Sequence, residues 1–225
     1  MKKILTILGL IALMVAVATG AVLGTLAFLK DTDGEINTMV IGDVEIDLHE
    51  GNGQGAVDEA YQQWLAQQKL EPGQTTAKQV WVQNIGMNDA YIRVHVALPA
   101  TTDGKILTLD TAIPHDATYS TEIDGETYNV YVFVYKNVFA PGESTGLCLL
   151  SVSMNRFVDG ITNADGTVTY TCDEASYTAS DGKIPVLVFA EGGQSGGFDN
   201  AVSAMNDMFG VPGTYNPWAP TQPNP

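Results

Sequence analysis

Basic residues are scarce in this chain. Ten Lys and Arg stand against 26 Asp and Glu in 225 residues, which gives a net charge of −16 at pH 7. Contact with nucleic-acid phosphates or anionic lipid head groups needs clustered Lys and Arg, so the composition argues against both kinds of partner. Charged residues make up only 16% of the chain and apolar residues 45%, which is typical of a domain that buries a core rather than of a charge-driven disordered chain.

Histidines are also few, and none of the three stands in a metal-binding pattern. His49-Glu50 begins like the zinc-protease motif, but Gly53 occupies the position where the second His is required. His95 alternates with the valines of a predicted strand and is expected on its exposed polar face, while His115 is expected in an exposed loop. We therefore predict no metal ligands and no cofactor.

Serine catalysis is not indicated either. Gly193–Gly197 has the Gly-x-Ser-x-Gly spacing of a nucleophile elbow, but no His follows it in the sequence. The acidic segment Asp31–Glu35 resembles the start of an EF-hand calcium-binding loop. However, Ile36 occupies the position that requires Gly, and Gly42 occupies the position that requires a bidentate Glu. We predict no catalytic residues.

The first 27 residues are predicted to be a signal peptide. Lys2 and Lys3 precede an apolar run over 4–26, long enough to cross a bilayer. The small residues of Thr25-Leu26-Ala27 predict cleavage between Ala27 and Phe28. An uncleaved anchor helix is the alternative. Cleavage would remove two Lys and no acidic residue, leaving eight basic and 26 acidic residues and a net charge of −18.

Only two cysteines are present, which excludes a multi-disulfide scaffold and a Cys-based zinc site. Cys148 and Cys172 both lie in strand-like sequence. Export permits a disulfide between them, and we favour that interpretation. The alternative is two reduced thiols that pack as small hydrophobic residues.

The remainder of the chain predicts a mainly β fold with two short peripheral helices. Alternating apolar residues predict strands, and four Asp-Gly pairs predict the turns between them. Helical spacing predicts helices over 57–69 and 198–209, the second ended by Gly210. We expect an antiparallel β-sandwich domain over 28–211 and a disordered Pro-rich tail over 212–225. The strands are expected near 43–48, 80–82, 92–98, 130–134, 147–154 and 184–190.

One predicted strand is apolar on both faces. Tyr131, Phe133 and Tyr135 alternate with valines, so a second apolar layer is needed over the aromatic side. Either a helix covers these three aromatic residues, or they form a subunit interface.

Four segments resemble the TasA/camelysin family of secreted bacterial proteins. The departures are Leu29, where an aromatic residue is more usual, and the poorly matched segment 100–130. The matching segments are Ala27–Gly34 followed by Asn37–Gly42, Glu71–Val94 with its Pro-Gly turn, Phe139–Thr145, and Ala190–Phe209.

The resemblance implies a jelly-roll sandwich, exported after cutting by a dedicated signal peptidase, in a family that includes subunits of biofilm matrix fibres. In the fibre-forming members the freed N-terminal segment pairs with the sheet of the next subunit. Here Phe28, Leu29 and Ile36 would be the apolar anchors of that donor strand. The partner would be a second copy in a head-to-tail homopolymer, or a related matrix protein.

Two other functions remain open. Camelysin is classed as a metallopeptidase, so the resemblance also allows a cell-surface enzyme. The third interpretation is a monomeric secreted adhesive or carbohydrate-binding module. It is supported by two aromatic residues expected to be exposed, Tyr215 and Trp218.

Overall fold

A computed structural model describes residues 31–33, 37–39 and 44–219. The predicted signal peptide, its cleavage site at Ala27 and Phe28, and the donor-strand anchors Phe28, Leu29 and Ile36 lie outside these residues.

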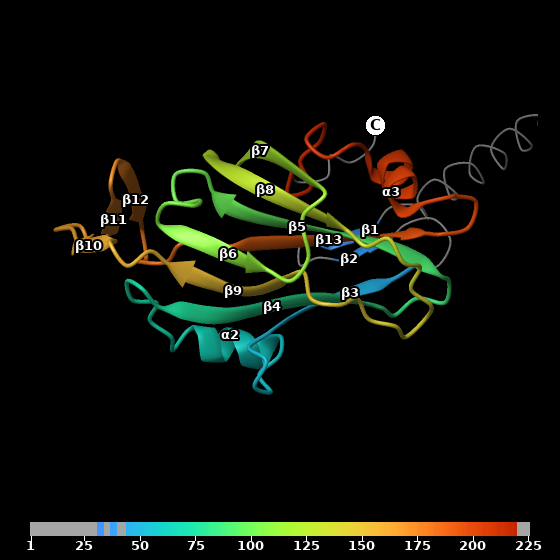
Figure 1. Cartoon of the computed structure of the whole chain (residues 1–225), viewed down its shortest axis with the longest axis horizontal. Helices are drawn as coiled ribbons and strands as arrows, with labels where there is room; N and C mark the ends of the chain where they lie inside the picture. The colour runs from blue at the N-terminus through green and yellow to red at the C-terminus, as the bar shows by residue number, and fades with distance from the viewer. Residues whose placement is uncertain (1–30, 34–36, 40–43, 220–225) are drawn as a thin grey trace, which may run out of the picture.

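Two four-stranded antiparallel sheets pack face to face, as predicted for a mainly β sandwich (Figure 1). We call them the upper and lower sheets after their positions in Figure 1. The upper sheet has the order β13-β5-β8-β7, with β13 Leu187–Gln194, β5 Ala90–Pro99, β8 Glu126–Val134 and β7 Ala117–Ile123. The lower sheet has the order β3-β4-β9-β6, with β3 Ile46–Gly51, β4 Thr75–Asn84, β9 Leu149–Met154 and β6 Leu107–Thr111.

The main core lies between the two sheets, where alternate residues of each strand point inward. Phe133 and Tyr135 belong to this core together with valines and isoleucines of β4 and β5, and Tyr131 packs against it. The three aromatic residues are therefore covered by the lower sheet. The prediction that a helix or a partner subunit covers them is wrong, because that face of β8 looks into the sandwich.

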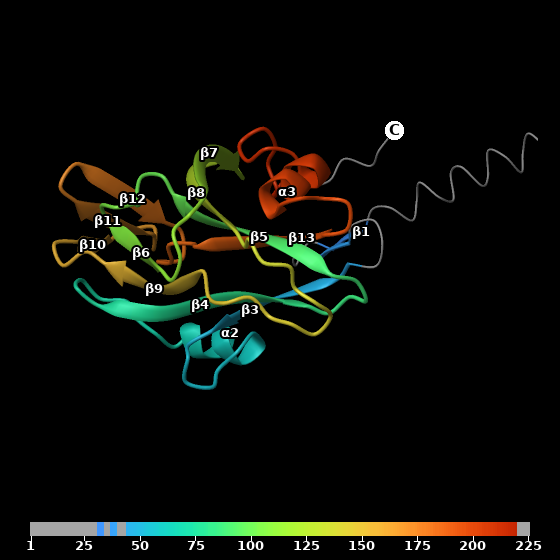
Figure 2. The same cartoon turned by 45° about the vertical axis from the view of Figure 1, so that its right-hand side comes forward.

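Two helices cover the outer faces, as expected. Figure 2 shows α2, Glu59–Leu65, against the lower sheet and α3, Ala201–Phe209, against the upper sheet. Asn200 caps α3 by accepting a hydrogen bond from Ser203 N–H, and Gly210 ends the helix with a φ of 97°. Within the described ranges, neither helix is long and apolar enough to cross a membrane.

The valine face of β8 is the one that α3 covers. Val130, Val132 and Val134 share a second apolar cluster with Ala204 and Met205 of the helix. Because one side of β8 meets the lower sheet and the other meets α3, this strand is apolar on both faces.

The Asp-Gly pairs form turns. Asp124 and Gly125 have φ values of 52° and 81° and join β7 to β8 between the paired residues Ile123 and Glu126. Two positive φ values in a two-residue connection suit the twist of a hairpin, and Gly adopts them without steric cost.

Seven strands in the described residues escaped prediction from sequence, among them the short pair β1 (Asp31–Asp33) and β2 (Asn37–Met39). Besides β6 and β7, a separate three-stranded sheet stands beyond one end of the sandwich (Figure 1). The strand over 159–162 has all four residues exposed and gives no periodic signal. The other two strands do alternate, with apolar residues at 168, 170 and 172 and at 175, 177 and 179, and sequence reasoning missed this signal. The three strands of this sheet are β10 Asp159–Thr162, β11 Val168–Cys172 and β12 Ala175–Ala179.

The cysteines are free and buried. Cys148 packs in the core between the sheets, whereas Cys172, on β11, packs in a third apolar cluster with residues such as Ile106 and Met154. The disulfide that we favoured is not formed, because the two thiols occupy different apolar clusters. The alternative of two thiols that pack as small hydrophobic residues describes the structure.

Candidate functional site

Three ionisable side chains are buried together on the outer face of the upper sheet. Arg93 and His95 come from β5, and Glu191 comes from β13, where it pairs with Arg93 across the strands. Arg93 and His95 are 0% exposed and Glu191 is 1% exposed. The expectation that His95 lies on an exposed polar face is therefore wrong, because α3 and the chain after it cover this face.

Arg93 uses its guanidinium to join four elements. Its Nε donates to Glu191 Oε2 at 2.5 Å, and Nη1 donates to Asn206 Oδ1 of α3 at 3.0 Å. Its Nη2 donates to the Gly210 carbonyl at 3.2 Å and to the Tyr215 hydroxyl at 2.7 Å. The planar fork of donors thus connects β5, β13, α3 and the segment after α3.

His95 continues the network toward β7. Its Nε2 lies 3.2 Å from Glu191 Oε2, and its Nδ1 lies 3.3 Å from the Tyr119 hydroxyl. Phe189 and Trp218 pack edge-on to the imidazole, with ring centroids 6.3 and 6.2 Å away. The imidazole is therefore held by polar partners at both nitrogens and by aromatic rings around it.

The network keeps one carboxylate ionised beside neutral phenols. Burial by itself would raise the pKa of Glu191, but the hydrogen bonds and charges of His95 and Arg93 outweigh it and lower that pKa below 4.5. Burial, followed by the charge of Glu191, raises the pKa of Tyr119 and of Tyr215 well above 10.0. At neutral pH both phenols keep their protons, and Tyr215 donates a hydrogen bond to the ionised Glu191.

Chemically, this arrangement clamps elements together. Tyr119, His95 and Glu191 stand in the order of a nucleophile, base and orienting carboxylate. However, Tyr119 keeps its proton to high pH, and the groups beside it are enclosed by protein. Every buried side-chain nitrogen and oxygen in the described residues has a hydrogen-bond partner. The network therefore suits positioning of α3 and the C-terminal segment.

Residues 212–219 of the predicted disordered tail pack on the sandwich. We call residues 211–219 the C-terminal strap. Tyr215 donates to Glu191 Oε1 at 2.5 Å, and Asn216 Nδ2 donates to the Glu122 carbonyl on β7 at 2.9 Å. Trp218 packs on the second apolar cluster. The prediction of a disordered tail does not hold for 212–219, and Tyr215 and Trp218 are half-buried against the protein itself rather than displayed to a ligand.

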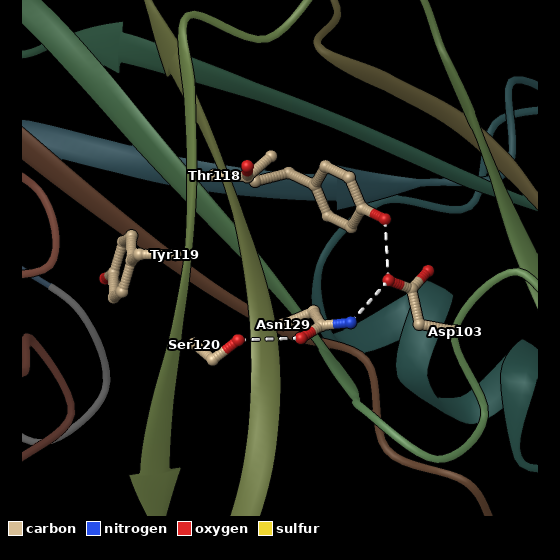
Figure 3. Close-up of a pocket in the computed structure, with 6 residues that line it drawn as sticks. Asp103, Thr118, Tyr119, Ser120 and Asn129 are labelled. Carbon is tan, nitrogen blue, oxygen red and sulfur yellow. Dashed lines mark hydrogen bonds between the residues drawn. The ribbon is translucent and has the colours of Figure 1, made fainter.

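A polar hollow of about 350 Å³ lies at the β7–β8 edge. Asp103, from the loop after β5, accepts hydrogen bonds from Asn129 Nδ2 at 2.9 Å and from the Tyr131 hydroxyl at 2.7 Å. Figure 3 shows Ser120 donating in turn to Asn129, and Thr118 on the same strand as Ser120. The hollow offers a carboxylate, an amide and hydroxyl groups, which are groups that bind a hydroxyl-rich ligand.

Of the other residues considered from sequence, His115 packs edge-on to Tyr131, which lines the hollow, with ring centroids 5.3 Å apart. His49 contacts Asp58 at 2.8 Å and stacks on Trp81, and His115 is exposed as predicted. Ser195 donates to the Asp89 carbonyl at 3.3 Å. Among residues 31–33, 37–39 and 44–219, no three His, Cys, Asp or Glu side chains are grouped so that they could hold a metal ion.

Sequence reasoning missed the Arg93–Glu191 network. One signal was present: Arg93 and His95 interrupt the otherwise apolar strand, and Glu191 follows Val-Phe-Ala in another. A buried charge requires a partner of opposite sign. Comparison with known proteins adds no assignment, since the chain matches no protein-family model and no curated protein is detectably similar to it.

Proposed function

We propose that this protein is an exported structural subunit of extracellular matrix fibres, which assembles by donating its N-terminal segment to the sheet of a neighbouring copy. The apolar leader and the resemblance to the TasA/camelysin family support export and assembly. The jelly-roll form is supported by the path of the chain, which crosses from one sheet to the other between β4 and β5, β5 and β6, β6 and β7, and β8 and β9.

The observation that carries the proposal is the pairing of the first two strands. Within the described residues, β1 (Asp31–Asp33) and β2 (Asn37–Met39) pair with each other and join neither large sheet. β2 lies beside β13 and β3. A strand pair that takes no part in the ladders of the sandwich can leave without breaking them, so this segment is suited to exchange between copies.

The edges of the sandwich suggest where an incoming strand would bind. The edge strand β7 is partly capped by the strap, through Asn216 and the Glu122 carbonyl. The edge strand β3 is capped by Asp58, which donates to the Glu50 carbonyl and accepts from Glu50 N–H. Strand β13 is bonded to β5 on one side only within the described ranges, so its other edge, next to β2, is our candidate acceptor.

Deleting residues 28–36 from the secreted protein tests the mechanism. We expect filaments, seen by electron microscopy at matched protein and salt concentration, to be lost while the thermal unfolding transition is retained. A deletion of residues 220–225 is the control and should leave filaments unchanged. Undiminished filaments from the 28–36 deletion would contradict strand donation.

Salt should promote growth of the filaments. Each secreted copy carries a net charge of −18 if residues 1–27 are removed, so neighbouring copies repel one another, and this repulsion is screened within about 10 Å at 0.1 M salt. Filament growth that slows as salt is raised would show that charge repulsion does not limit assembly.

The polar hollow favours a second candidate, a monomeric adhesive module that binds a hydroxyl-rich ligand such as a carbohydrate. Asp103 and Asn129 are the groups that would accept and donate hydrogen bonds to sugar hydroxyls. Binding of an oligosaccharide mixture, measured by calorimetry and lost in Asp103→Asn but kept in Asp110→Asn, would favour this function. No binding to the unmodified protein would remove it.

A further inference from the structure

The strap is held to the sandwich through one ionised carboxylate. The Tyr215 hydroxyl stands between two charges, because it accepts a hydrogen bond from Arg93 Nη2 and donates one to Glu191 Oε1. Both bonds involve charged groups, which makes them stronger than bonds between neutral groups. The strap is also held by the Asn216 bond to β7, by Tyr215 and Trp218 packing edge-on to His95, and by Trp218 packing on Phe189.

We propose that residues 211–219 are an acid-released strap, which ionised Glu191 holds closed over the upper sheet and which opens when Glu191 takes up a proton, while the sandwich stays folded. This inference goes beyond the fibre proposal and does not depend on it. Its consequence is control of access to the surface beneath the strap, which includes Tyr119 and Phe189.

The physical cause of opening is the charge that protonation leaves behind. A neutral Glu191 no longer balances Arg93, and an unpaired buried cation is strongly destabilising. Water can reach and solvate Arg93 most easily where the covering element is most weakly anchored. The strap is the more weakly anchored cover, because α3 buries Ala201, Ala204 and Met205, whereas none of residues 211–219 is fully buried.

The main core does not depend on the strap. The cluster between the sheets contains residues of both sheets and none of residues 211–219. Trp218 packs only in the cluster on the outer face of the upper sheet. Opening would therefore uncover one outer face and leave the contacts between the sheets in place.

The direction of the pH effect follows from the groups that face Glu191. Arg93 and His95 face it from β5, Tyr119 faces it from β7, and Tyr215 faces it from the strap, while α3 contributes the uncharged Asn206 through Arg93. The pKa of Glu191 lies below 4.5 in the closed structure. Its contribution to closure is therefore complete above pH 4.5 and is lost as the pH falls through the lowered value.

Closure also has an alkaline limit. Burial and the charge of Glu191 raise the pKa of Tyr215 above 10.0, because the closed strap favours the neutral phenol. The contribution of this phenol is complete below pH 10 and is lost as the pH rises through the raised value. The strap is thus closed between these limits, which include neutral pH.

Amide hydrogen exchange followed by NMR on the secreted protein tests the proposal at residue resolution. The reporters are the amides of Thr214, Trp218 and Ala219, which are bonded within the strap. After correction for the pH dependence of intrinsic exchange, their protection should fall by about tenfold or more between pH 6 and pH 3.5. Amides in the β5–β8 ladder should keep theirs. Simultaneous loss of both sets would overturn the proposal.

Two variants separate the strap from general destabilisation. In Tyr215→Phe the strap amides should lose protection already at pH 6 and show no acid step, while the ladder amides stay protected. Tyr170→Phe is the matched control, because this half-buried Tyr of β11 donates to the Gly182 carbonyl rather than to Glu191. This variant should still lose strap protection between pH 6 and pH 3.5. Glu191→Gln should also abolish the step. If that variant does not fold, Tyr215→Phe decides the question. Strap amides protected as strongly in Tyr215→Phe as in the unmodified protein would refute the proposal.

Discussion

Arg93 and Glu191 lie 98 residues apart in the sequence and form an ion pair, Nε to Oε2 at 2.5 Å, on the outer face of a β-sheet. Their side chains are 0% and 2% exposed. The outer face of a sandwich sheet is ordinarily solvated. Here the pair is enclosed because α3 and the strap lie over it, and the guanidinium in turn bonds to both of these elements.

Removing Glu191 should be destabilising. Glu191→Ala leaves Arg93 without its carboxylate partner, but opening of the strap lets water solvate Arg93, so we expect the free energy of unfolding, measured by urea denaturation, to fall by less than the ~3–5 kcal/mol that an enclosed unpaired charge costs. The double variant Arg93→Met with Glu191→Leu should recover much of that loss, because no charge is then buried.

The control for that experiment is Asp181→Ala. Asp181 forms an ion pair with Lys183 in which both side chains are more than half exposed, so no measurable change is expected. Equal effects of Glu191→Ala and Asp181→Ala would contradict the structural role of the buried network.

Truncating Phe133 should destabilise the isolated subunit. The ring is fully buried between the sheets, so Phe133→Ala should cost about 3–5 kcal/mol in urea unfolding of the monomer. Phe157→Ala is the matched control, since Phe157 is 68% exposed, and it should change stability little. A stable Phe133→Ala monomer with weakened self-association would restore the aromatic residues as a subunit interface.

The thiol of Cys148 should be inert in the folded protein. Burial raises the pKa of Cys148 to about 12, and only the thiolate reacts with disulfide reagents. We expect no reaction of Cys148 with such a reagent at pH 8 in native protein. Two thiols per chain should react after denaturation without reductant, whereas a count of zero would reveal a disulfide with Cys172.

Strand β13 should not tolerate a side chain at Gly192. A Cβ there would lie 2.5 Å from Ile46 Cγ2 on β3, and the β-branched Ile46 has little freedom to move away. Gly192→Ala should therefore cost about 1–3 kcal/mol. At Gly196 no atom lies within 4 Å of such a Cβ, so Gly196→Ala should be tolerated. Similar unfolding midpoints for the two variants would argue against close packing of β13 on β3.

Local sequence was sufficient for elements whose signal is local. Alternation around Val130 predicted a strand, helical spacing with Gly210 predicted α3, and Asp124-Gly125 predicted a turn. Each signal depends on neighbours in sequence, through side-chain period or backbone conformation, and each is present in the structure. The two cysteines had no such signal, since a pairing depends on where two distant strands are packed.

The covering of each face was decided only by the tertiary structure. Period-two alternation shows that β5 and β8 have two different faces, but it does not say which layer each face meets. From sequence, His95 is predicted to be a solvent-exposed strand residue, and Tyr215 is predicted to belong to a disordered Pro-rich tail. Both are enclosed because β13 brings Glu191 beside Arg93 and the strap closes over them. Such contacts join residues about a hundred positions apart, so their energy depends on the assembled fold and leaves no periodic trace in the chain.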